Sequence, residues 1–193
     1  MVGILLDDRE FAFAEYHAYK AAVGGISRFR SREDRLEKLL FDQQTGMRGE
    51  LGGFLWYYGL DGLWKWDQQR IRRNENPRQG DNGVDFVLPD GRTVNIKSSR
   101  LLPGRCVTSY HLYVRPEEPK ADVYVGTVVD GRMVHLLGSA THEMLPADVY
   151  HGYPFDGAKV LPFEALRPIL SNGRDDTVGY LSFPEQGALD LGR

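Results

Sequence analysis

Three polar residues near the middle of the chain have the types and spacing of a hydrolytic site. Asp85 precedes a Pro-Asp-Gly turn, and Asn95 and Lys97 follow it. Side chains alternate along a strand, so Asn95 and Lys97 share one face while Val94 and Ile96 point to the other. A hairpin about the turn brings Asp85 about level with Lys97. The sequence therefore predicts that a carboxylate, an amide and an ammonium group meet at one sheet edge.

Such a group suits metal-dependent hydrolysis of a phosphodiester. A carboxylate binds a hard cation such as Mg²⁺ through oxygen. The cation polarises the phosphate and lowers the pKa of a bound water, and a nearby lysine orients that water or offsets developing charge. Glu50 is a candidate second carboxylate, because its segment Met47–Gly53 is rich in small residues that permit close approach to a sheet or a substrate.

The basic residues are unevenly distributed along the chain. Residues 1–115 hold 18 Lys and Arg against 15 Asp and Glu, whereas residues 116–193 hold 6 against 12. This segregation is compatible with a surface for a polyanion, although ordinary solvated faces vary as much. The candidate phosphate contacts are Arg70, Arg72, Arg73, Arg100, Arg105, Ser98 and Ser99. The alternatives are ordinary surface arginines and a turn role for the two serines.

The elements that must position these residues are predicted from hydrophobic spacing. Helices are predicted over residues 7–23, from Ser31 onward, over 45–59, over 145–150 and over 163–170. Strands are predicted over residues 63–67, 83–88, 93–97, 107–114, 121–129 and 132–137. Helices followed by a run of strands and a mixed end predict an α/β (α+β) fold with a central mixed sheet flanked by helices.

Length and composition favour one globular domain. The chain has 193 residues, of which 41% are hydrophobic and 26% charged. No run approaches the roughly 18 apolar residues of a membrane span, so no membrane partner is expected. A single cysteine, Cys106, excludes an internal disulfide framework and a cysteine-based zinc site. A soluble, cytoplasmic protein is the simplest expectation.

The pattern of Asp85, then Asn95-Ile96-Lys97 across a glycine turn, with Glu50 in the preceding helix, resembles the PD-(D/E)XK nuclease superfamily. The resemblance covers roughly residues 45–170. It implies a restriction-endonuclease-like core over 45–170 within a single domain of residues 1–193, with N-terminal helices over 1–44 and a tail over 171–193. It also implies that Asp85 is a metal ligand, Lys97 the catalytic lysine and Glu50 the helix acid, with Mg²⁺, or Mn²⁺ in its place, as cofactor and DNA as substrate.

The chain departs from this family at Asn95, where Asp or Glu is usual. An amide oxygen can bind a cation but carries no charge, so it binds more weakly. Three explanations stay open: a natural variant that recruits its acid elsewhere, an inactivated relative that only binds nucleic acid, or a deliberate substitution at Asn95.

The leading hypothesis is a Mg²⁺-dependent deoxyribonuclease in which Asp85, Asn95, Lys97 and Glu50 form the catalytic site. It would act alone, as a homo-oligomer or in a larger DNA-processing assembly. The alternatives are an inactive module of the same fold that binds DNA or a protein partner, and an unrelated α+β domain.

Overall fold

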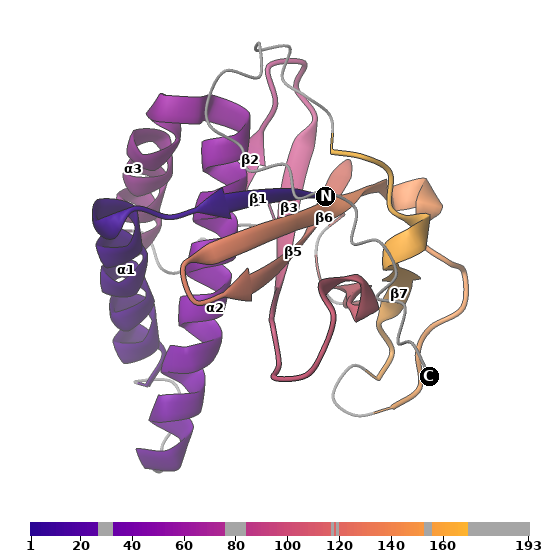
Figure 1. Cartoon of the computed structure of the whole chain (residues 1–193), viewed down its shortest axis with the longest axis horizontal. Helices are drawn as coiled ribbons and strands as arrows, with labels where there is room; N and C mark the ends of the chain where they lie inside the picture. Colours follow the sequence, from indigo (N-terminus) through magenta and orange to yellow (C-terminus); the bar gives the residue numbers. More distant parts are fainter. Residues whose placement is uncertain (27–32, 76–83, 117, 119, 153–155, 170–193) are drawn as a thin grey trace, which may run out of the picture.

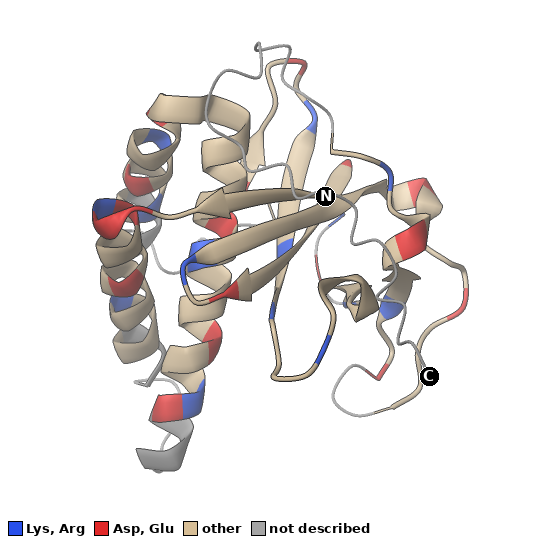
Figure 2. Ribbon diagram, viewed as in Figure 1, with Lys and Arg blue, Asp and Glu red and all other residues tan. Residues whose placement is uncertain are grey.

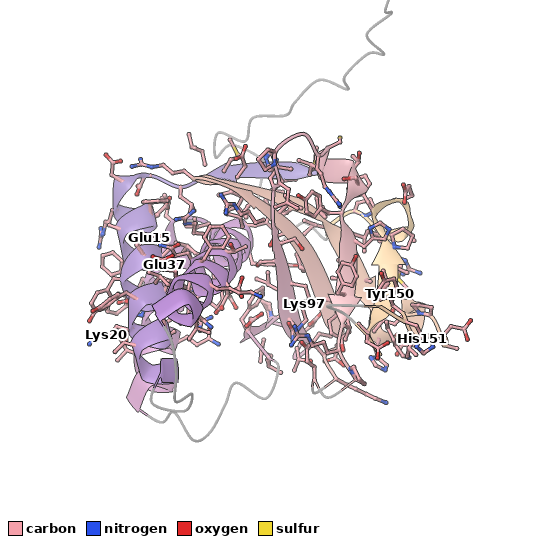
Figure 3. All side chains as sticks on the ribbon, turned by 90° about the horizontal axis from the view of Figure 1, so that it is seen from below. Glu15, Lys20, Glu37, Lys97, Tyr150 and His151 are labelled. Atoms are coloured by element: carbon pink, nitrogen blue, oxygen red, sulfur yellow. The ribbon has the colours of Figure 1, made fainter. Side chains whose placement is uncertain are left out.

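Helices cover one face of a five-stranded sheet and a two-stranded sheet covers the other (Figure 1). The computed structural model describes residues 1–26, 33–75, 84–116, 118, 120–152 and 156–169. The elements are β1 (Val2–Leu5), α1 (Asp8–Ile26), α2 (Glu33–Tyr58), α3 (Gly62–Glu75), β2 (Phe86–Val87), β3 (Thr93–Arg100), β4 (His111–Val114), β5 (Val123–Asp130), β6 (Met133–Thr141) and β7 (Lys159–Pro162). Figure 3 shows the same layers from a second direction. The fold is mixed α/β, consistent with the α+β class that the sequence predicts.

The larger sheet runs in the order β1-β6-β5-β3-β2. β3 and β5 are parallel, with Val94 beside Val123 and Arg100 beside Val129, whereas the other neighbouring pairs are antiparallel. A parallel pair requires a crossover connection. Here residues 101–122 form it, and β4 lies within it and pairs with β7. The crossover therefore returns the chain past the face of β3 before β5 begins.

β5 is buried on both faces, which explains its nearly continuous run of apolar residues. Val123, Val125 and Val129 belong to the core between the sheet and the helices. Tyr124 packs instead with Leu112 and other residues of the small sheet. The central strand thus has a hydrophobic core on each side.

Glycines on α2 let the helix backbone rest directly on the sheet. A Cβ added to Gly52 would lie 2.6 Å from Val134 Cγ1, and one added to Gly53 would overlap Ile96 Cδ1. A Cβ on Gly49 would overlap the Ser98 hydroxyl. These separations are well inside the roughly 3.5–4.0 Å of ordinary contact. Larger residues at these positions would push α2 away from β3 and β6.

Several predicted elements are confirmed. The first helix is α1, and the hairpin about the Pro-Asp-Gly turn is β2–β3. Its first strand is shorter than the predicted 83–88, and Phe86 pairs with Val94, so Asp85 lies level with Asn95 and not with Lys97 as predicted. The hairpin over residues 121–137 is β5–β6, with β6 running on to Thr141. The region over residues 107–114 is confirmed in part, because a 3₁₀ turn at Val107–Ser109 precedes β4. The tail over 171–193 and the start of the second helix at Ser31 lie outside the described residues.

The strand predicted over residues 63–67 is wrong, because this segment belongs to α3. Trp64 and Trp66 were expected on one side of a strand. On a helix, residues two apart are rotated by about 200°, and the two rings separate accordingly. Trp66 is fully buried, whereas Trp64 is 65% exposed.

Other boundaries also differ from the prediction. The second and third predicted helices are one helix, α2, which continues through Gly46. The helix predicted over 145–150 is absent there, since Pro146 disfavours a helical conformation at Leu145. The last predicted helix is only a 3₁₀ turn, Phe163–Ala165. After it, Arg167 exchanges backbone hydrogen bonds of 2.8 and 2.9 Å with Ser139 of β6.

The sequence did not reveal β1, which pairs with β6 along Val2–Leu5. A four-residue strand at the chain start has no turn signal to mark it. In the part of the chain that the structure describes, no helix is long and apolar enough to cross a membrane.

The glycine contacts predict that alanine changes stability in opposite directions at two positions of α2. Gly49→Ala is expected to lower the free energy of unfolding by about 2 kcal/mol, since the new methyl group overlaps Ser98 and Thr127. Gly46→Ala is the control, because a Cβ there meets nothing within 4 Å, and it should raise stability by about 0.5 kcal/mol through helix propensity. Urea unfolding of both variants measures the difference; equal effects would contradict the packing described here.

Candidate functional site: a buried polar cluster beside a cationic pocket

Three of the residues that the sequence singled out are buried polar side chains. Glu50, Asp85 and Asn95 have exposed fractions of 6%, 8% and 4%, and they are half of the six buried polar or charged residues among the described side chains. Burying such groups is unfavourable unless hydrogen bonds or opposite charges compensate them. Their surroundings therefore show how the fold stabilises them.

Asp85 is bound to the backbone of β3. Its own N–H donates to the carbonyl oxygen of Val94 over 2.7 Å. Its carboxylate oxygen Oδ2 accepts the N–H of Ile96 over 2.6 Å. That nitrogen belongs to the peptide bond that joins Asn95 to Ile96, so the carboxylate lies beside Asn95. A backbone N–H bonded to an ionised oxygen is a strong, charge-assisted hydrogen bond.

α3 connects Glu50 to Asp85 through two consecutive residues. Arg70 forms an ion pair with Glu50, and the two side chains are only 13% and 8% exposed. Gln69 donates to the backbone carbonyl of Asp85. We call Glu50, Arg70, Asp85 and Asn95 the buried polar cluster. Arg70, predicted as a phosphate contact, lies within this cluster.

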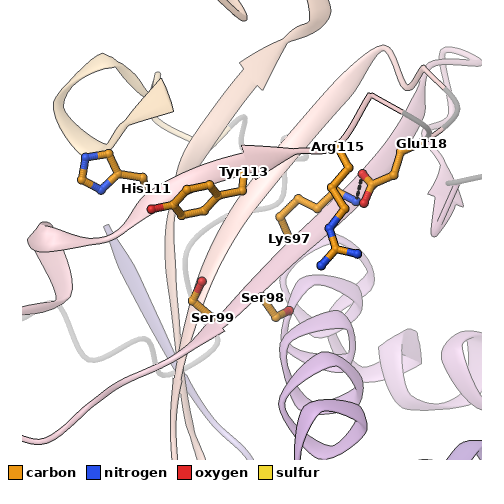
Figure 4. A pocket seen from close by; sticks show the side chains of 7 residues that line it. All are labelled: Lys97, Ser98, Ser99, His111, Tyr113, Arg115 and Glu118. Atoms are coloured by element: carbon orange, nitrogen blue, oxygen red, sulfur yellow. Dashed lines mark ion pairs between the residues drawn. The ribbon is translucent and has the colours of Figure 1, made fainter. Parts of the chain in front are cut away.

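Lys97 lies two residues beyond Asn95, on the same face of β3, and forms an ion pair with Glu118 (Figure 4). It is also labelled in Figure 3, between the helical layer and the small sheet. Beside it is a pocket of about 180 Å³. The pocket is lined by Lys97, Ser98, Ser99, His111, Tyr113, Arg115 and Glu118, and we call it the Lys97 pocket.

Strand alternation explains the composition of the pocket. His111, Tyr113 and Arg115 are alternate residues of β4 and its continuation, while the intervening Leu112 and Val114 are buried in the core. The crossover thus presents the polar face of β4 to β3.

The charge of a further arginine reaches the pocket. Burial is the main cause that raises the pKa of Tyr113, nearby Tyr150 adds to the rise, and the positive charge of Arg105 opposes it. Arg105 is exposed. In Figure 2 basic segments recur along β3 and the loop that follows it.

The two predicted serines lie on opposite sides of β3. Figure 4 shows Ser99 on the side of Tyr113, whereas Ser98 points toward α2. The hydroxyl of Ser98 accepts a 3.0 Å hydrogen bond from Thr127. Ser98 thus contributes to packing as well as to the pocket rim.

The remaining predicted arginines do not join the pocket lining. Arg100 is exposed and its guanidinium carbon lies 4.0 Å from the ring centroid of Phe41. The side chains of Arg72 and Arg73 lie outside the described part of the structure.

Four pocket residues were not among the candidates: His111, Tyr113, Arg115 and Glu118. The alternation His-x-Tyr-x-Arg over 111–115 was a usable signal of a strand with one polar face. Glu118 had no such signal, because only the three-dimensional crossover brings it to Lys97.

The donor types of the buried polar cluster fit a hard divalent cation. Asp85, Glu50 and Asn95 all present oxygen atoms, the ligands that Mg²⁺ prefers. Their negative charge is lower than in a set of three carboxylates, because Asn95 is neutral and Arg70 neutralises Glu50. Within the described residues, no group of three His, Cys, Asp or Glu side chains is arranged to hold a metal ion.

The Glu50–Arg70 pair predicts a strong dependence of stability on Arg70. Arg70→Met removes the cation from a buried carboxylate and should lower the free energy of unfolding by about 3 kcal/mol. Adding Glu50→Gln should recover a large part of that loss. The exposed pair of Arg92 and Asp90 is the control, where Arg92→Met should cost at most about 1 kcal/mol. Denaturant unfolding measures all four chains, and equal losses for Arg70→Met and Arg92→Met would contradict the burial of the pair.

Comparison of the chain with protein-family models, with curated proteins and with solved structures gives no match. The functional argument therefore rests on the residues and their arrangement.

Proposed function

We propose that the chain is a metal-dependent nuclease with a restriction-endonuclease-like core that hydrolyses phosphodiester bonds of DNA. The observation that carries the proposal is the order of groups along β3. Asn95, with Asp85 bound beside it, is buried, and Lys97 follows at the mouth of a cationic pocket. An oxygen donor for a cation and a basic group for a phosphate thus lie two residues apart on β3, with Asp85 bound to the same strand.

The cluster residues would hold the metal ion. Asp85, Asn95 and Glu50 are the ligands, with Mg²⁺ or Mn²⁺ as the ion. When bound, the cation supplies polarisation of the phosphate and a more acidic water. Glu50 reaches this role only if its pairing with Arg70 loosens, because the guanidinium and the cation compete for the same carboxylate.

Lys97 would act on the reacting group itself. It shares the strand face of Asn95, so its ammonium group can orient the attacking water or offset the negative charge that grows on the phosphate. Its ion pair with Glu118 keeps the ammonium near the pocket in the free protein. Ser99 and Arg105 would hold the neighbouring DNA backbone.

A non-catalytic module that binds DNA is the second candidate. The observation in its favour is the neutralised metal set: residue 95 is Asn, and Glu50 is already paired with Arg70. Such a chain would keep the cationic pocket while losing cation affinity. It would function within a larger DNA-processing assembly.

DNA cleavage and metal binding test the two candidates together. We expect the wild-type chain to cut plasmid DNA in Mn²⁺ or Mg²⁺. Asn95→Asp should bind Mn²⁺ about tenfold more tightly by calorimetry without DNA, because it adds one ligand charge, and should cut faster. Lys97→Ala should bind Mn²⁺ as the wild type does and lose about 100-fold in cleavage rate.

Lys65→Ala is the control for loss of a lysine, since Lys65 is exposed on α3 and lies over Tyr58. It should cut at the wild-type rate. If neither the wild type nor Asn95→Asp cuts, and both still bind DNA, the non-catalytic module is the correct description. If Asn95→Asp fails to change Mn²⁺ affinity, residue 95 is not a metal ligand.

A further inference from the structure

The Lys97 pocket carries an excess of positive charge. Among the described residues that line it are Lys97 and Arg115, with His111 as a third basic side chain, against one carboxylate, that of Glu118. His111 and Arg115 are exposed, so an anion can reach them from solvent. Such a pocket attracts a ligand with negative charge and several acceptor oxygens.

The size of the pocket suits a small anionic group. Its volume of about 180 Å³ is below the roughly 300–1,000 Å³ of pockets that enclose drug-sized ligands. A phosphate group fits these limits, while an attached nucleoside would extend into solvent. The hydroxyl of Ser99 adds a neutral donor beside the cations.

Glu118 already places an anion in this pocket. Its carboxylate pairs with Lys97; the side chain of Lys97 is 20% exposed and that of Glu118 is 25% exposed. Glu118 lies in the crossover between β4 and β5 rather than in either strand. A carboxylate that meets a lysine within a cationic pocket occupies the position that an incoming phosphate oxygen would take.

We propose that the Lys97 pocket binds a backbone phosphate of nucleic acid through Lys97, Arg115 and Ser99, and that Glu118 competes with this phosphate for Lys97. This inference deepens the proposed function, because it names the group of the substrate that the pocket holds. It assigns Arg115 to phosphate binding and Glu118 to an internal counter-ion that the phosphate displaces.

The charge of Arg105 supports a nucleic acid over an isolated anion. Arg105 is exposed on the loop that joins β3 to β4, and both of these strands contribute residues to the pocket. A polymer with phosphates at regular spacing can contact both this arginine and the pocket, which a single free phosphate cannot do.

DNA binding without metal tests the pocket separately from catalysis. The fluorescence anisotropy of labelled single-stranded and duplex oligonucleotides is measured in EDTA over a series of KCl concentrations. Arg115→Gln should weaken binding, and the slope of log K against log [KCl] for the duplex should fall in magnitude by about 0.9, the value for one lost phosphate contact. Glu118→Gln should bind about fivefold more tightly, because Lys97 loses its competitor.

A second ion pair of the chain supplies matched controls. Arg132 pairs with Asp8, and neither residue lines the pocket. Arg132→Gln and Asp8→Asn each change net charge by the same amount as the test variants. Both should change the affinity by less than about twofold, as distant exposed charges do under screening.

Several results would overturn the inference. Absence of DNA binding by the wild type contradicts the site directly. A slope of log K against log [KCl] for Arg115→Gln that equals that of the wild type contradicts the proposal as well, and so do equal changes of DNA affinity in Glu118→Gln and Asp8→Asn. A polyglutamate peptide that competes as well as unlabelled DNA of equal charge would show an unspecific anion site instead. Binding that follows the prediction without any cleavage removes the nuclease and keeps the phosphate site. If the wild type cleaves DNA but Arg115→Gln and Glu118→Gln bind DNA as the wild type does, the nuclease proposal stands and the phosphate site is rejected.

Discussion

The close approach of α2 to β3 is the constraint on which the site depends. Gly49 lies directly against the side chain of Ser98, and Gly53 lies against the side chain of Ile96, so α2 contributes no side chain of its own at these two contacts. Glu50, next to Gly49, is consequently held in a buried position. A carboxylate in such a place needs a compensating charge, which α3 provides through Arg70. Helix packing therefore determines the electrostatics of the cluster as well as its position.

β3 then sorts side chains to the two faces of the sheet. Ile96 and Ser98 meet α2, whereas Lys97 and Ser99 meet the crossover that carries β4. A core strand can thus bear a polar site without loss of its hydrophobic contacts, because each face uses alternate residues. Asp85 directly precedes the two-residue strand β2, and its carboxylate accepts a backbone N–H of β3.

The parts of this arrangement that are local in sequence were predictable. A Pro-Asp-Gly turn and strand alternation are enough to bring Asp85 to the strand that carries Asn95 and Lys97. The parts that depend on distant segments were not. Arg70 belongs to α3, whose first part over residues 63–67 was predicted as a strand, so its pairing with Glu50 was unforeseen.

The same limit applies to the pocket. One side of the Lys97 pocket is formed by β3 and the other by the crossover between β3 and β5. The path of this crossover depends on which residues of β3 and β5 pair, and no short sequence pattern predicts that pairing. Composition showed an excess of basic residues over positions 1–115, but it did not show which of those residues would converge. Glu118 illustrates the point, since its contact with Lys97 joins residues 21 positions apart.

Charge balance gives the two halves of the site opposite preferences. In the buried polar cluster, the described acidic side chains are those of Glu50 and Asp85 and the described basic one is that of Arg70, so acidic groups predominate. In the pocket, Lys97 and Arg115 outnumber Glu118, which leaves an excess of positive charge. Asn95 and Lys97 are two residues apart on β3, so these opposite fields adjoin. A cation and a phosphate that bind together would each complement one half, whereas either one alone would leave the other half uncompensated. In the proposed nuclease, an uncharged Asn95 would therefore weaken the binding of a cation by the cluster without altering the attraction of the pocket for a phosphate.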